Sequence, residues 1–316
     1  MAGVSIEAPR GRTDLTVADL RLRAGRRRRE GFVRKAFFAA AAMSILLNVL
    51  IVVTLFDGTV DFLSRVDPGL LWTDGWFPRR NLYDLRTIVG GTLLVAAVAL
   101  VVAAPLGLGA AIYLAEYASR RARRRLKPIL EVLAGIPSVV MGFFALTWIS
   151  PNIMQRFTDA GIFSLGAAGI GVGILITPLV ASVAEDAMFA VPSSLREASY
   201  GLGARKRSTT LRVVFPAAIS GIVAALILGV SRAIGETLVV AIAAGGTGGS
   251  LFTLNVTDQG QTMTAAMTAL ATGSDQVRGA ELAFPSLFFV GALLFFMTLA
   301  LNLMSERFVR RVRGRY

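Results

Sequence analysis

The chain of 316 residues contains no cysteine and no histidine, and three of its 33 basic residues are lysines. The absence of cysteine excludes disulfides, thiol catalysis and thiolate metal sites. The absence of histidine removes the commonest general base and metal ligand. Lys35, Lys127 and Lys206 do not follow a glycine, so the sequence has no GxxxxGK phosphate-binding loop. If the protein uses ATP, another chain must bind the nucleotide.

Apolar residues are abundant: they make up 54% of the chain, and the mean hydropathy is +0.64. They form long blocks, and a block of about 20 apolar residues crosses a ~30 Å hydrocarbon core as a helix. The pattern predicts an all-α polytopic membrane protein with six transmembrane helices, at residues 36–56, 87–115, 129–150, 161–184, 217–244 and 282–304.

The net charge of +13 comes from basic clusters between the predicted spans. The N-terminal tail, the loops 116–128 and 185–216 and the C-terminus hold 10, 6, 5 and 5 basic residues, against 4, 1 and 1 in the three opposite loops. Because Lys and Arg favour the cytoplasmic side of a membrane, both termini are expected in the cytoplasm. Clusters of this kind favour orientation signals over nucleic-acid binding.

The same pattern predicts three parts of the chain. Residues 1–35 form a basic cytoplasmic tail, residues 36–304 form the six-helix domain, and residues 305–316 form a basic cytoplasmic C-terminus. We expect the tail to be flexible, and an amphipathic helix on the membrane surface is the alternative.

Two segments on the opposite side have distinctive compositions. Residues 57–86 carry aromatic residues that favour anchoring at the headgroup level over contact with a partner, namely Trp72, Trp76, Phe77 and Tyr83. Residues 245–281 open with Gly-Gly-Thr-Gly-Gly and continue with a helix-like run at 261–272. This second segment either dips into the mouth of a pathway or forms a docking surface, and the sequence does not choose between them.

The loop 185–216 combines polar, basic and glycine residues immediately before the fifth span. Ser193 or Ser194 can cap a short helix, and Gly201 and Gly203 suit its end and the following turn. Pro216 is tolerated in the first turn of the next helix. The loop is therefore expected to form a short cytoplasmic helix along the membrane surface, joined directly to the fifth span.

The fifth span carries an ionisable pair, Arg232 and Glu236. On a continuous helix, residues four apart share a face and can pair, and charged residues inside a membrane normally face a protein interior or a water-filled path. The planar guanidinium suits phosphate-like oxyanions. One hypothesis is that Arg232 meets a translocating oxyanion and that Glu236 holds Arg232 when the path is empty. The other is a permanent structural ion pair, and chemistry alone leaves both open.

The sequence EASYGLG, followed after nine residues by VVFP, resembles the EAA loop of ABC importer permeases, whose pattern is EAA-x3-G-x9-I-x-L-P. Ser199 stands in place of the second alanine. In that family the loop forms a coupling helix that fits a groove on the ATP-binding subunit. The resemblance implies a type I ABC importer permease fold and contacts with the ATPase at Glu197, Ala198, Ser199 and Gly203.

Other segments resemble the phosphate importer permeases, the Pst family, and more its PstC type than its PstA type. They are GVSRAIGETLVV, LAGIPSVVMGFFAL at 133–146 and the second span at 91–118, and the resemblance covers about residues 60–305. It implies that Arg232 and Glu236 are required for phosphate passage. Ser138 could donate a hydrogen bond to the solute, although an intramembrane serine more often bonds its own helix. Met141 departs from the family, where many members have tyrosine.

The resemblance implies a subunit without catalytic activity in the bacterial cytoplasmic membrane. It would pair with a homologous PstA-like permease, sit on two ATP-binding subunits that hold ATP and Mg, and receive phosphate from an extracytoplasmic binding protein. One alternative is a permease for another oxyanion, such as sulfate, molybdate or phosphonate; a protonated phosphate offers Glu236 a donor that sulfate lacks, which favours phosphate. Less favoured alternatives are an ion-driven secondary transporter and a phosphate-signalling scaffold.

Overall fold

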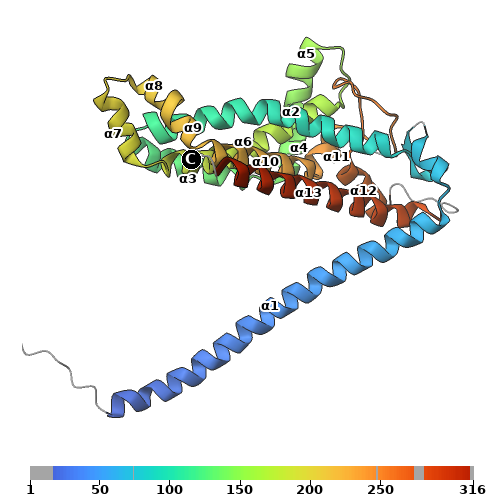
Figure 1. Cartoon of the computed structure of the whole chain (residues 1–316). Coiled ribbons are helices and arrows are strands. Elements are labelled where there is room, and N and C mark those ends of the chain that lie inside the picture. Colours follow the sequence, from blue (N-terminus) through green and yellow to red (C-terminus); the bar gives the residue numbers. More distant parts are fainter. Residues whose placement is uncertain (1–16, 74, 247, 274–280, 314–316) are drawn as a thin grey trace, which may run out of the picture. The chain divides into compact units, whose positions relative to one another are not determined.

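The computed structural model describes residues 17–73, 75–246, 248–273 and 281–313, and it is mostly helical (Figure 1). Contacts divide the chain into two compact units, residues 1–54 and 55–316. In the first unit the described residues belong to α1 (Val17–Arg65). The predicted basic tail is therefore helical from Val17 onward, whereas its first 16 residues lie outside the described part.

Four helices are long and apolar enough to cross a membrane. They are α1 from Glu30, α2 (Leu85–Ile112) with the π-helical turn η3 (Tyr113–Tyr117), α6 (Leu165–Phe189) and α13 (Ala283–Arg313). Two bent helix pairs satisfy the same criterion together, so the described residues allow up to six spans. The first, second, fourth and sixth predicted spans are confirmed in place, and α13 continues past residue 304 to Arg313.

The third predicted span, 129–150, is not a single straight helix. The chain forms α3 (Arg120–Leu133) and then α4 (Ser138–Phe144), which continues as the π-helical η4 (Ala145–Met154) and α5 (Gln155–Phe157). The two parts meet at an angle of 87°. Pro137 explains the break, since the residue before a proline is driven out of the helical region.

The segment from α6 to the fifth span bends sharply. It contains α7 (Ser193–Gly201), α8 (Lys206–Thr209), the π-helical η5 (Thr210–Val214) and α9 (Phe215–Ala217). The stretch 206–217 meets α10 (Ile219–Ile234) at 71°. The predicted continuous span 217–244 is also wrong, because α10 ends at Ile234 and α11 (Leu238–Ala243) begins after a break.

Helices α2 and α6 lie side by side in the centre of the second unit (Figure 1). Glycines permit this close approach: a Cβ added at Gly169 or Gly173 would lie 2.6 or 2.7 Å from the Cβ of Val98 or Val102. In membrane proteins small residues at helix interfaces serve this purpose. The core around these helices also includes residues of α10 and α11, so the interrupted span is packed against the centre of the fold.

A small irregular region closes the end of the bundle opposite α7 (Figure 1). It contains η1 (Pro68–Trp72), η2 (Pro78–Arg80), the hairpin β1 (Trp76–Phe77) and β2 (Leu82–Tyr83), and α12 (Met263–Ala271). Trp76 and Tyr83 are fully buried, so they are core residues and the predicted role in anchoring is wrong for them. Burial raises the pKa of Tyr83 to about 12, so its phenol stays neutral. Trp72 is 63% exposed and remains available as an anchor.

Candidate functional site

The charged pair of the fifth span lies where its helix is interrupted. Arg232 is in the last turn of α10, Gly235 caps that helix, and Thr237 precedes α11. The Arg232 side chain is exposed in the single chain, whereas Glu236 is 8% exposed. The break therefore turns the two residues into different environments. In transporters such discontinuous helices commonly form substrate and ion sites, because freed backbone groups become available there.

The pairing of Arg232 with Glu236 is not observed. Among the residues that the structure describes, no ion pair joins them, because the continuous helix that would align them ends at Ile234. The backbone of Glu236 is instead held from α12: the Thr264 hydroxyl donates to the Glu236 carbonyl oxygen at 2.8 Å. The interrupted geometry thus leaves the Arg232 guanidinium free of this carboxylate.

The predicted Ser138 lies on α4, a helix that packs against α11. Ser138 is the first residue of α4 and is half-buried, and no hydrogen bond of its hydroxyl is found in the described structure. Gly142, one turn later, lets α4 contact α11 closely: an added Cβ would lie 3.1 Å from the Leu238 carbonyl oxygen. Met141 is buried in the core that includes Ala233 of α10. Helix α4, which begins at Ser138, therefore packs against α11, the helix that follows the break with Arg232 and Glu236.

Two polar contacts near Arg232 were not predicted from the sequence. The neighbouring Ser231 hydroxyl lies 3.0 Å from the amide oxygen of Asn302 on α13. Thr264, which holds Glu236, lies 28 residues further along the chain. The sequence signalled these contacts only through a polar residue inside an apolar helix, such as Asn302. That signal did not identify Ser231 as the residue that Asn302 contacts.

Helix α7 ends in a glycine-dependent turn at the predicted position. Gly203 has φ +78°, its N–H donates to the Tyr200 carbonyl, and the Ala204 N–H donates to the Ser199 carbonyl. These two bonds form a Schellman motif, in which the residue with positive φ is normally glycine. Gly203 therefore shapes the loop. The predicted serine cap is wrong, because Pro192 occupies the N-cap position and Ser193 begins the helix.

The first residues of the EAA-like sequence are accessible. Glu197, Ala198 and Gly203 are exposed, while Ser199 is half-buried and its hydroxyl lies 2.8 Å from that of buried Thr209. The sequence did not predict that Leu202, between the two glycines, would be 90% exposed. Exposed apolar side chains beside charged ones are suited to contact with another protein.

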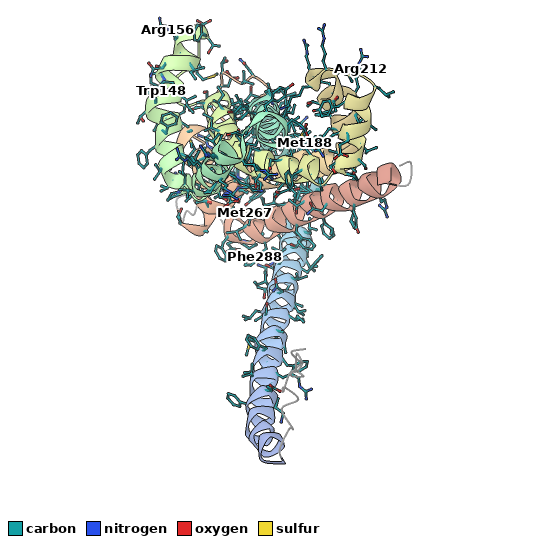
Figure 2. The ribbon with its side chains drawn as sticks, turned by 90° about the vertical axis from the view of Figure 1, so that its left-hand side faces the viewer. Trp148, Arg156, Met188, Arg212, Met267 and Phe288 are labelled. Carbon is teal, nitrogen blue, oxygen red and sulfur yellow. The ribbon has the colours of Figure 1, made fainter. Side chains whose placement is uncertain are left out.

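Arg196 connects α7 to two other helices. Its guanidinium donates to the Glu116 carboxylate at 2.9 and 3.1 Å, to the Met188 carbonyl at 2.9 Å and to the Val191 carbonyl at 2.6 Å. The Glu116 side chain is 3% exposed and the Arg196 side chain 19%. Figure 2 shows Met188 in the interior of the bundle. The contact fixes α7 to the ends of α2 and α6 at once.

The chain combines an interrupted span that carries an exposed arginine with an exposed helical loop at one end of the bundle. This arrangement is typical of a membrane-embedded transport subunit. Residues 103–314 match the family model described as binding-protein-dependent transport system inner membrane component. The chain belongs to this family of ABC transporter permeases. It is thus a multi-pass inner-membrane protein and a transport subunit.

The chain is similar to proteins of known name. It is 32% identical over 228 residues to the phosphate transport system permease protein PstC of Pasteurella multocida. The matched region covers 66% of this chain and 71% of that protein. It is 40% identical over 178 residues to the phosphate transport system permease protein PstA 1 of Mycobacterium tuberculosis. That matched region covers 55% of this chain and 56% of that protein.

The fold also matches a solved structure, that of a bacterial ABC transporter involved in the import of the acidic polysaccharide alginate. The TM-score is 0.56 at 14% identity, with 90% of this chain and 99% of that chain covered. This likeness confirms the predicted type I ABC importer permease fold.

Proposed function

We propose that the chain is a permease subunit of an ATP-driven importer of inorganic phosphate. The observation that carries the proposal is the exposed Arg232 at the interrupted span, in a chain that matches a phosphate permease over most of that protein's length. Arginine keeps its charge in any protein environment and offers a planar set of donors that fits phosphate oxygens.

In this proposal Arg232 meets the phosphate, and Ser138 and Glu236 supply a donor and an acceptor nearby. Glu236 is buried and Arg232 is exposed, and no ion pair joins them in the described residues. The carboxylate would therefore accept a hydrogen bond from protonated phosphate after a movement of the break. Ser138 is half-buried, and its hydroxyl has no hydrogen-bond partner among the described residues. This favours a contact with the solute over a bond within its own helix.

The driving force would arrive through α7. Glu197 and Ala198, with the exposed Leu202, would contact an ATP-binding subunit, while Ser199 and Gly203 maintain the shape of the loop. ATP and Mg would be held by two such subunits, because this sequence has no nucleotide-binding loop. The partners would also include a second, homologous permease, an extracytoplasmic phosphate-binding protein and membrane lipid, with α7 and both termini in the cytoplasm.

Uptake of radiolabelled phosphate with sulfate as competitor tests the choice of substrate. In cells that depend on this chain, we expect uptake that unlabelled phosphate suppresses and sulfate leaves unchanged. Of the two anions, phosphate carries a hydroxyl that can donate a hydrogen bond to the Glu236 carboxylate, and sulfate does not. Cells without the chain provide the background. Suppression by equal concentrations of sulfate would reassign the permease to oxyanions in general, and uptake that is independent of the chain would exclude the proposed function.

A further inference from the structure

A second basic region lies at the α7 end of the bundle, on α3 (Figure 1). Six of the 14 residues of this helix are basic: Arg120, Arg121, Arg123, Arg124, Arg125 and Lys127. A cavity of about 640 Å³ opens between α3 and the end of α6. Its lining residues are Arg120, Arg123, Arg124, Lys127, Pro128, Glu131 and Phe189. Four cationic side chains on successive turns therefore face one space.

Two of these cations, Arg123 and Lys127, are held in place by acidic residues of α6. The Glu185 side chain is fully buried, forms an ion pair with Arg123 that is not aligned as a hydrogen bond, and accepts from the Lys127 ammonium at 2.8 Å. Lys127 also pairs with Asp186. The Arg123 guanidinium lies over the Phe189 ring, 3.6 Å from its centroid. These contacts give the cavity a fixed floor, in which the charges of Arg123 and Lys127 are largely compensated.

The other two cations are not compensated in this way. Arg120 and Arg124 have no ion pair in the described part of the chain, and Glu131 is the one acidic residue among the lining side chains. They lie in the first two turns of α3, and both side chains are exposed. The cavity thus combines a fixed floor of paired charges with two guanidinium groups that have no ion pair in the described residues.

We propose that this cavity binds a phosphate group. Guanidinium forks match the geometry of phosphate oxygens, and the apolar walls, Pro128 and Phe189, accommodate a carbon-bearing ligand as well as a free ion. The group comes either from free inorganic phosphate or from the headgroup of an anionic lipid, since basic pockets between membrane helices bind such headgroups. The inference is independent of the proposed function, because it concerns residues outside the interrupted span.

The test compares two double variants of the full chain in its assembled complex. Arg120→Gln with Arg124→Gln removes the available cavity charges and leaves both Glu185 ion pairs intact. Arg121→Gln with Arg125→Gln removes the same charge from the same helix at positions that do not line the cavity. One arm measures binding of radiolabelled inorganic phosphate by equilibrium dialysis. The other measures the immobilised fraction of spin-labelled phosphatidylglycerol in phosphatidylcholine vesicles, with spin-labelled phosphatidylcholine as reference.

We expect the cavity variant to weaken binding in at least one arm by about tenfold, which corresponds to about 1.4 kcal/mol, while the control variant behaves as the wild type. The arm that responds identifies the source of the phosphate group. Unchanged binding in both arms overturns the inference, and so does an equal loss in both variants, which would indicate a diffuse charge effect. Loss of the ATP-binding subunit from the complex with both probes unaffected would also overturn it, since the cavity would then be a protein contact.

Discussion

Replacing Arg232 with glutamine is expected to lower the rate of phosphate uptake by about ten- to hundredfold, because hydrogen bonds to charged groups contribute about 1.5–3 kcal/mol each. The side chain is exposed and unpaired with Glu236, so its loss should not disturb the packing of α10. We therefore expect the variant to reach the membrane in normal amounts. Radiolabelled phosphate uptake, normalised to the amount of chain in the membrane, measures the effect.

Two further variants sharpen this test. Arg232→Lys keeps the charge but loses the planar fork, so we expect uptake between that of the wild type and that of Arg232→Gln. Arg156→Gln is the control for charge. It removes one positive charge from α5, where Arg156 is exposed and lies far along the chain from the interrupted span (Figure 2). We expect this variant to take up phosphate at the wild-type rate. Wild-type uptake by Arg232→Gln would show that this arginine does not meet the substrate.

Replacing Arg196 with alanine is expected to separate ATP hydrolysis from transport. The substitution removes the four hydrogen bonds that fix α7 to α2 and α6 and leaves the carboxylate of Glu116 buried without its partner. Breaking a buried ion pair in this way costs about 3–5 kcal/mol. The exposed face of α7 remains, so the ATPase should still bind, but the movement of α7 would no longer reach the spans. The measurement is the amount of phosphate transported per ATP hydrolysed.

A conservative variant and a control distinguish coupling from folding. Glu116→Gln retains the shape of the contact and an oxygen that accepts from Arg196, but not the negative charge. We expect a smaller fall in the same ratio, and a smaller loss of thermal stability, than for Arg196→Ala. Arg205→Ala changes an exposed arginine of the same loop that has no ion pair in the described structure, and it should keep the wild-type ratio. If Arg196→Ala and Arg205→Ala gave the same ratio of transport to hydrolysis, the Arg196 contact would have no role in coupling.

The sequence was sufficient where local rules decide the structure. Glycine at 203 predicted the end of α7 because the left-handed backbone there excludes most other residues. Apolar length predicted α2, α6 and α13 within a few residues at their starting ends. The resemblance to the EAA loop implied contacts with an ATP-binding subunit at Glu197 and Ala198. Both residues are exposed, and the contacts themselves stay a prediction.

The breaks in two spans were not predicted, because hydrophobicity does not report them. Pro137 carried a signal for the first break, but proline is also tolerated within membrane helices, as Pro105 in α2 and Pro178 in α6 demonstrate. The second break follows Ile234, and the Glu236 carbonyl is held there by Thr264 from α12. A contact between residues that far apart has no signature in local sequence.

The Arg196–Glu116 pair joins residues 80 positions apart, and it lay outside sequence reasoning for the same reason. In the sequence, each of the two residues is one of several charged residues near the ends of predicted spans, so neither could be singled out as a partner. Their burial, at 19% and 3% exposed, is what distinguishes them from the solvated charges of the same loops, and burial follows from the tertiary packing of α2, α6 and α7.

The central claim, import of phosphate driven by ATP, is tested most directly in sealed vesicles that contain the chain with its paired permease and ATP-binding subunits. ATP is supplied on the α7 side, and the binding protein loaded with radiolabelled phosphate on the opposite side. The account predicts accumulation of phosphate on the α7 side with ATP and none with a non-hydrolysable analogue. Accumulation that is equal in both conditions, or that follows an imposed ion gradient without ATP, would contradict it.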